Sequence, residues 1–127
     1  MTWSQIQGVR EGTAQVFTFK LRIAEPGATR FGPERVLFRE ELPLPFGGHL
    51  HAVDFRTNTV PKNAVLMVHG IPRVFLVWDA CRARPEDFLC EEPVIRLTHS
   101  DNDGASWTAP SVLSRGGDNY FPTIAAG

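Results

Sequence analysis

The sequence predicts an all-β protein built from antiparallel strands. Ten prolines and eleven glycines interrupt the chain at short intervals, and no stretch keeps apolar residues at the spacing of three and four positions that an amphipathic helix requires. Residues 15–23 (QVFTFKLRI) instead alternate apolar and polar side chains, which is typical of a strand with one buried face. Residues 64–68 (AVLMV) and 73–78 (RVFLVW) are short, nearly continuous apolar runs, which are typical of strands buried on both faces.

The other elements follow from the same patterns. The HGIP sequence at residues 69–72 predicts a tight turn between the two apolar runs. Residues 39–57 and 79–93 are polar or proline-rich, so we expect two long loops, which are the usual carriers of function on a rigid scaffold. Residues 94–99 alternate again and predict a strand, and two shorter stretches, 110–113 and 120–125, are further strand candidates.

Composition excludes several classes of protein. The chain has 127 residues, enough for one domain at most, and 43% of them are hydrophobic, which argues against disorder. Its 13 basic and 14 acidic residues are interspersed, so it lacks the basic stripe expected of a nucleic-acid-binding protein. No apolar run approaches the ~20 residues of a membrane span, and the N-terminus lacks the pattern of a signal peptide.

The two cysteines, Cys81 and Cys90, flank one polar loop. A hairpin would bring them together as a disulfide, which would place the protein in an extracellular or periplasmic compartment. The alternative is a pair of reduced thiols near strand ends, in which case the compartment stays undetermined. No other cysteine or histidine pair accompanies them, so a zinc site is not expected.

An internal repeat runs through the chain. Residues 27–37 align with residues 104–113 when Arg30 is treated as an insertion, and both copies read Gly-Ala-Thr/Ser, aromatic, Pro, Val-Leu. Asn-x-x-Pro-x-x-Ala follows each copy, at residues 58–64 and 119–125. A repeated unit of this kind predicts an architecture in which similar sheets stack on one another.

The second copy resembles a known motif. Ser100-x-Asn102-x-Gly104-x-Ser106-Trp107 is similar to the Asp-box, the bacterial neuraminidase repeat, with Asn102 where that family prefers aspartate. The resemblance implies four-stranded blades of a sialidase-like β-propeller. Residues 58–113 would then form a complete blade, residues 15–57 part of the preceding blade with an inserted loop, and residues 119–127 the first strand of the next. Because so few blades leave sheet faces and edges uncovered, we expect completion by further blades of a longer chain or by copies in a homo-oligomer.

The resemblance also implies a structural role for the motif itself. Asn102 would accept backbone N–H groups in a hairpin turn, Gly104 would adopt a positive φ and Trp107 would pack beneath the turn. The alternative is a Ca²⁺ loop, since Asp101 and Asp103 alternate, but no distal glutamate follows them. Apart from this Ca²⁺ alternative, we expect neither a metal nor another cofactor.

Two histidines, His49 and His51, are candidate metal ligands. His49 and His51 would share one face of an extended segment, with Asp54 nearby, but no third ligand can be identified and solvated loop histidines are the plainer interpretation.

In a propeller of this type the loops opposite the motif would face the ligand. Mixed charges and amides in those loops suit sugar hydroxyls, and they also suit plain solvent. The candidate ligand-binding residues are Asp54, Arg56, Asp79, Arg82, Arg84, Asp118 and Asn119.

No catalytic residue can be assigned. Sialidase catalysis, as the resemblance implies, needs three arginines, a Tyr/Glu pair and an acidic residue, yet the Arg-Ile-Pro motif has no counterpart here and Tyr120 is the only tyrosine. We therefore expect a non-enzymatic module that recognises a glycan or a protein. The alternative is a piece of a sialidase-type exo-glycoside hydrolase whose catalytic residues lie outside these residues.

Overall fold

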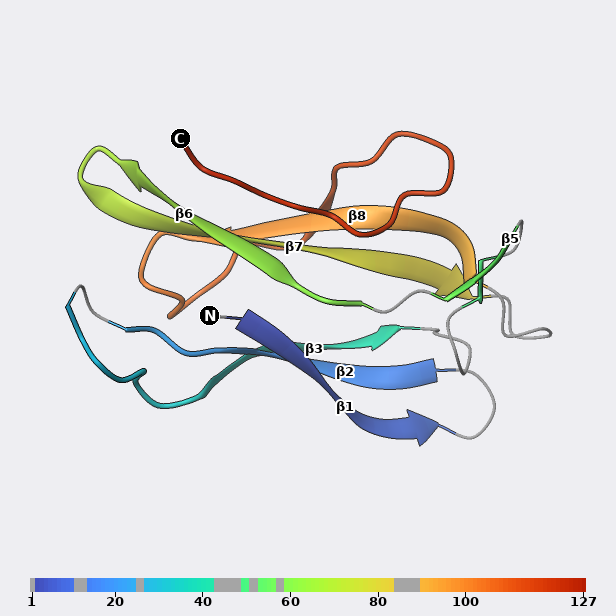
Figure 1. Cartoon of the computed structure of the whole chain (residues 1–127), viewed down its shortest axis with the longest axis horizontal. Coiled ribbons are helices and arrows are strands. Elements are labelled where there is room, and N and C mark those ends of the chain that lie inside the picture. Colours follow the sequence, from blue (N-terminus) through green and yellow to red (C-terminus); the bar gives the residue numbers. More distant parts are fainter. Residues whose placement is uncertain are drawn as a thin grey trace.

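The computed structural model of the chain describes residues 2–10, 14–24, 27–42, 49–50, 53–56, 59–83 and 90–127. Within these residues the protein is all-β, as predicted, and contains no helix, hence none that could cross a membrane. The strands form two sheets that lie face to face (Figure 1).

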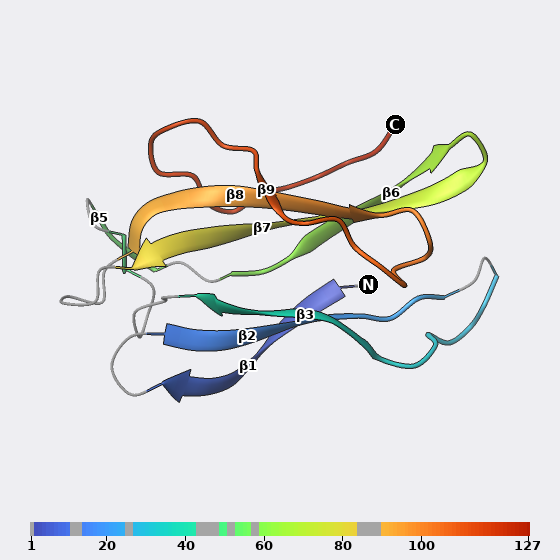
Figure 2. The same cartoon turned by 180° about the vertical axis from the view of Figure 1, so that it is seen from behind.

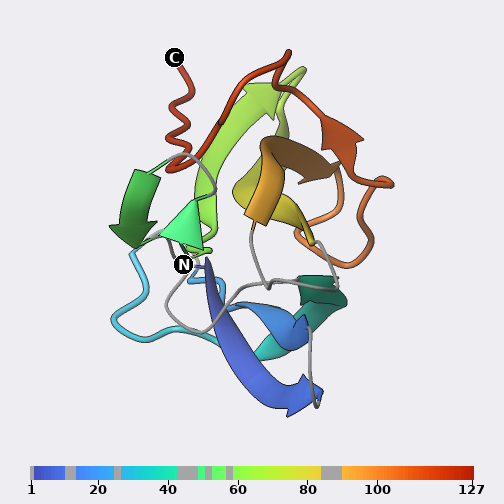
Figure 3. The same cartoon turned by 90° about the vertical axis from the view of Figure 1, so that its right-hand side faces the viewer.

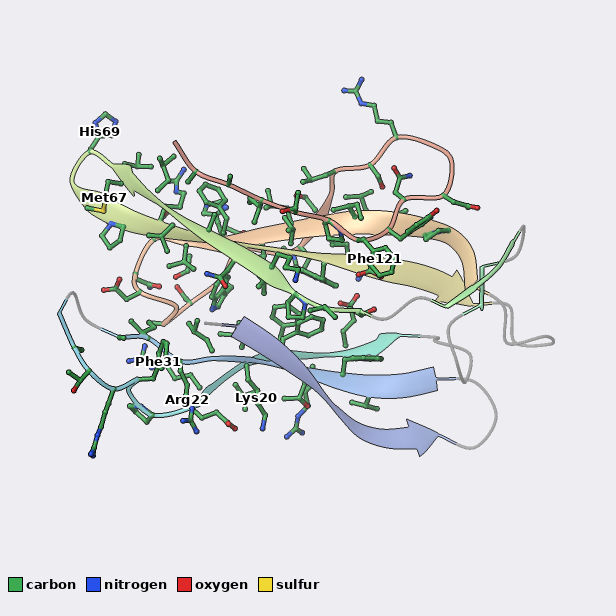
Figure 4. All side chains as sticks on the ribbon, in the orientation of Figure 1. Lys20, Arg22, Phe31, Met67, His69 and Phe121 are labelled. Carbon is green, nitrogen blue, oxygen red and sulfur yellow. The ribbon has the colours of Figure 1, made fainter. Side chains whose placement is uncertain are left out.

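The first sheet has the order β1-β2-β3 and is antiparallel throughout. Its strands are β1 (Thr2–Arg10), β2 (Ala14–Leu21) and β3 (Arg35–Leu42). The alternation predicted for residues 15–23 is confirmed, because Phe17, Phe19 and Leu21 are all buried on one face of β2. In Figure 4 the labelled Lys20 points to the other side, away from the second sheet.

The second sheet has the order β5-β4-β8-β7-β6, with β9 pairing β8. Its strands are β4 (His49–Leu50), β5 (Val53–Arg56), β6 (Lys62–Val68), β7 (Ile71–Ala83), β8 (Cys90–Ser100) and β9 (Ser111–Val112). β6 to β9 form an antiparallel meander within the range predicted as one four-stranded unit (Figure 2). The predicted tight turn joins β6 to β7 through His69 and Gly70, both of which have positive φ.

The core lies between the two sheets. Phe17 and Phe19 of β2 pack against Leu76, Trp78 and Ala80 of β7. Phe19, Trp78 and the half-buried Phe38 of β3 form an aromatic cluster with ring centroids 4.7 to 5.4 Å apart. Aromatic pairs at such separations add about 0.5–1.5 kcal/mol beyond the area they bury, so this cluster is a main link between the sheets.

The repeat found in the sequence recurs in the strand pairing. In the first copy Lys20 pairs with Val36 and Leu21 with Arg35, and in the second Arg96 pairs with Val112 and Leu97 with Ser111. The partners Val36 and Val112, and likewise Arg35 and Ser111, are aligned residues of the two copies.

The turn of each copy is closed in the same way. Gly27 and Gly104 both have positive φ, at 80° and 76°. The N–H of Gly32 donates to the carbonyl of Ile23 at 2.7 Å, and the aligned N–H of Thr108 donates to the carbonyl of His99 at 3.0 Å. The two sheets therefore share one strand–turn–strand unit.

Several boundaries differ from the prediction. Strand β1 was not predicted, and strands occupy parts of both predicted loops, because β3 continues to Leu42 and β7 to Ala83. Charged residues in these stretches suggested loops, but a strand continues wherever a neighbouring strand offers a partner in register. The strand expected at residues 120–125 is absent from the structure, in which no described strand pairs with that segment.

Candidate functional site

The turn at residues 100–107 is held together by its own motif residues. The hydroxyl oxygen of Ser100 accepts the backbone N–H of Gly104 at 2.8 Å and that of Asn102 at 3.3 Å, and the hydroxyl donates to Asn102 Oδ1 at 2.9 Å. Asn102 Oδ1 also accepts the N–H of Ser106 at 2.9 Å, while Asn102 Nδ2 donates to Ser106 Oγ at 2.8 Å. The amide of Asn102 thus uses both its acceptor and its donor within the turn.

The glycine and the tryptophan complete the turn. A Cβ atom on Gly104 would lie 2.5 Å from Cδ2 of Leu21, so the position needs glycine for space as well as for its φ of 76°. Trp107 Nε1 donates to the carbonyl of Gly104 at 3.2 Å, and its ring packs against the core. These contacts are those of a structural brace between the sheets.

Of the acidic residues of the turn, Asp101 binds an arginine through its carboxylate, and Asp103 accepts a hydrogen bond through its backbone carbonyl. Arg73 binds the Asp101 carboxylate through both oxygens, with 3.1 Å between Nη2 and Oδ2. This hydrogen bond lowers the pKa of Asp101 and raises that of Arg73. Asp103 has a φ of 55° and its carbonyl accepts from Arg35 at 3.2 Å. In the described part of the chain, no three His, Cys, Asp or Glu side chains come together as metal ligands.

Asp79 differs most from its predicted setting. It was expected in a surface loop, but it lies in β7 opposite Ile95 and its exposed fraction is 5%. Burial raises the pKa of its carboxyl to about 6, although a hydrogen bond from its own backbone acts in the opposite direction. Asp79 Oδ1 has no hydrogen-bond partner. Because Trp78 and Ala80 face the core, alternation along β7 puts the Asp79 side chain on the outer face of the second sheet.

The other predicted ligand residues do not form one site in the structure. Asn119 closes its own turn, because its Nδ2 donates to the carbonyls of Gly116 and Gly117, each at 2.8 Å. Asp118, beside it, is exposed.

The structure does not describe the side chains of the remaining predicted ligand residues. Asp54 and Arg56 lie in β5 and Arg82 in β7, each described by its backbone alone, and Arg84 lies outside the described residues.

The two cysteines lie in neighbouring strands. Cys81 is in β7 and Cys90 in β8, where the register places Cys90 opposite Ala83. The register shifts between Ala80 and Arg82, which is where Cys81 lies. Their side chains are outside the described residues, so the disulfide stays a prediction. His49 is described only by its backbone, and His51 lies outside the described residues. Whether these histidines bind a metal or are solvated loop residues is therefore not tested.

A groove that the sequence did not indicate runs between the two sheets at their edge. Residues 37–40 of β3 form one wall and residues 105–110, which lead to β9, form the other, enclosing about 670 Å³. In Figure 3, β3 and the segment that leads to β9 both lie on the right-hand side of the view. The volume falls within the ~300–1,000 Å³ typical of ligand sites.

One residue of the groove lining, Glu40, belongs to a polar network beside the core. Trp78, fully buried, donates its indole N–H to Glu40 Oε2 at 2.8 Å, and the other carboxylate oxygen forms an ion pair with Arg96. Glu40 was predicted in a loop and carried no role, because nothing local in the sequence pairs it with residues so far along the chain.

A smaller pocket of about 410 Å³ lies between the turns of the two copies. Its lining includes Arg30, Phe31, Gly32, Arg35 and Asp103. The hydrogen bond from Arg35 to the Asp103 carbonyl crosses it, so the two repeat turns contact each other here.

Comparison of the chain with protein-family models, with curated proteins and with solved structures finds no match. The assignment of function therefore rests on the sequence pattern and the geometry.

Proposed function

We propose that this chain is a sialidase-like β-propeller segment that acts as a non-enzymatic binding scaffold for a glycan or a protein. The observation that carries the proposal is the shared strand–turn–strand unit, with the same pairing register in both sheets. Consecutive sheets that share one unit and stack face to face are the arrangement expected of neighbouring blades.

The repeat also indicates where another sheet would pack. Phe19 and Leu21 face the second sheet, and their equivalents in the repeat, Ile95 and Leu97, lie on the outer face of that sheet. If the stacking continued, this outer face would be covered as the inner face of the first sheet is covered. Segment 113–127 runs along this side of the sheet, and its labelled Phe121 is still 50% exposed (Figure 4).

The mass in solution tests this proposal. Light scattering on the purified chain should give a discrete multiple of 14.1 kDa if copies complete the structure. A chain extended by its following repeat should be monomeric and more stable if blades of one polypeptide do so. A monodisperse 14.1 kDa monomer that unfolds cooperatively and gains nothing from extension would contradict both forms.

A second candidate is a piece of a sialidase-type glycoside hydrolase. The observation that favours it is the resemblance of residues 100–107 to the Asp-box, a motif that sialidases carry, and the catalytic residues of the hydrolase would lie outside residues 1–127. A fluorogenic sialoside assay and a glycan array on the same sample separate the two candidates. Hydrolysis would support the hydrolase, whereas glycan binding without turnover would support the binding scaffold.

A further inference from the structure

The groove between β3 and residues 105–110, called the perimeter groove from here on, has an open strand edge along one wall. β3 pairs with β2 on one side, and no described strand pairs with its other side. In an antiparallel strand, alternate residues direct their N–H and C=O groups to each edge. The outer edge of β3 therefore offers backbone donors and acceptors along the groove, which is the feature that an added strand recognises.

The apolar part of the perimeter groove comes from both sheets. Leu37 and Phe38 of β3 and Trp107 of the opposite wall are half-buried and pack against the core. A shift in register between Phe19 and Lys20 makes Leu37 an extra residue in β3, and both Leu37 and Phe38 contact the core. Half-buried aromatic and aliphatic groups beside a free strand edge suit an apolar side chain of a bound segment.

Most polar side chains of the perimeter groove are already engaged. Ser106 Oγ accepts from Asn102, and Thr108 Oγ1 accepts the N–H of His99 at 3.1 Å. Glu40 is held by Trp78 and Arg96, so its negative charge is balanced. A sugar would need free hydroxyl, amide or carboxylate groups, and these side chains do not supply them.

Arg39 is the exception. It is exposed, and among the described residues it has no ion-pair partner. It pairs with Thr18, between the core-facing Phe38 and Glu40, so its side chain lies on the outer face of the first sheet, where the free edge of β3 borders the groove. With Glu40 and Arg96 balancing each other, Arg39 is an uncompensated positive charge beside the free edge of β3, within the described part of the chain. An acidic group on the ligand would complement it.

We propose that the perimeter groove binds an extended acidic peptide. The peptide pairs with the outer edge of β3, places an apolar side chain against Trp107 and Leu37, and places a carboxylate on Arg39. The inference rests on the binding role proposed above and names a protein segment as the ligand. Because one chain builds both walls, it does not depend on how further blades complete the molecule.

Selection from a displayed library of random linear peptides, panned on the full chain, tests this inference. The enriched sequences should combine β-forming apolar residues with Asp or Glu. Synthetic versions should shift the backbone amide resonances of residues 36–40 and 105–109 in a titration. Failure to enrich such peptides, or shifts confined to other parts of the chain, would overturn the inference.

Matched variants locate the site. Arg39→Glu should weaken peptide binding about tenfold or more, because it replaces attraction by repulsion. Arg115→Glu makes the same charge change on an exposed residue outside the groove lining and should change affinity less than about twofold. Equal effects of the two changes would overturn the inference.

A groove-filling variant provides a second, uncharged test. Ala109 is exposed and lines the groove, so Ala109→Phe should fold normally and abolish peptide binding. Retained binding would overturn the inference. A glycan whose binding Ala109→Phe abolished, while no peptide bound, would show the groove to be a sugar site and would leave the scaffold proposal standing.

Discussion

Replacing Asp79 by asparagine should make the protein more stable at neutral pH and change its stability little at pH 4. Burial raises the pKa of this carboxyl from 3.8 to about 6. Each unit of pKa difference between folded and unfolded chain is worth about 1.4 kcal/mol, so ionised Asp79 costs the folded state about 3 kcal/mol.

The direction with pH follows from the protonation state. A carboxyl whose pKa is raised on folding is best tolerated below its ordinary pKa, where it is uncharged in both states. Stability is then lost as the pH rises from about 4 to about 6, and the loss is constant above that range. Asparagine has the same shape and never ionises, so its variant should lack this loss.

Urea unfolding followed by tryptophan fluorescence measures the effect. The free energies of unfolding of wild type and Asp79→Asn should differ by about 2.5 kcal/mol more at pH 7.5 than at pH 4. Asp101, whose pKa is lowered, is present in both proteins and cancels from the comparison. Asp118→Asn, at an exposed carboxylate, is the control and should run parallel to the wild type. Parallel profiles for Asp79→Asn as well would show that burial does not raise the pKa of this carboxyl.

Three further results are expected. Gly104→Ala should lower the free energy of unfolding, measured by urea titration, by at least about 2 kcal/mol, since it adds a clash with Leu21 to a positive φ. Gly27→Ala has a similar positive φ but open space around it, so it should lower the stability less. Equal losses for the two variants would disprove the clash. Asn102→Ala should lower stability by about 1–3 kcal/mol because Ser106 loses both partners, whereas Asn102→Asp keeps the acceptor for the Ser106 N–H and should cost less; the reverse order would argue against the brace. Millimolar Ca²⁺ should leave the melting temperature within about 1 °C of its value in EDTA, because Arg73 already binds both oxygens of Asp101, and a larger rise would restore the calcium interpretation.

The sequence alone predicted those elements whose pattern lies within a few neighbouring residues. Alternation along residues 15–23 predicted both a strand and its buried face, and the spacing of Gly104 and Trp107 predicted a turn with those residues inside it. Such features depend on the period of a strand and on the conformational freedom of glycine, which neighbouring residues alone determine.

The remaining features depend on partners far along the chain. Asp79 looks like a loop residue until β8 supplies Ile95 opposite it. Glu40 becomes part of the core only because the sheets stack and bring Trp78 to it. Side-chain charge favours solvent on average, so a sequence pattern assigns these residues to the surface.

Because the two copies have the same pairing register, the chain contains two different sequences that form the same strand–turn–strand unit. Where the copies agree, as in the turn glycines, the residue meets a requirement of the unit itself. Where they differ, as Lys20 and Arg96 do in their pairs with Val36 and Val112, the unit does not require one particular residue, and the side chain can make contacts that belong to one sheet alone. Averaging the copies would therefore yield a consensus module, from which arrays of chosen length could be designed.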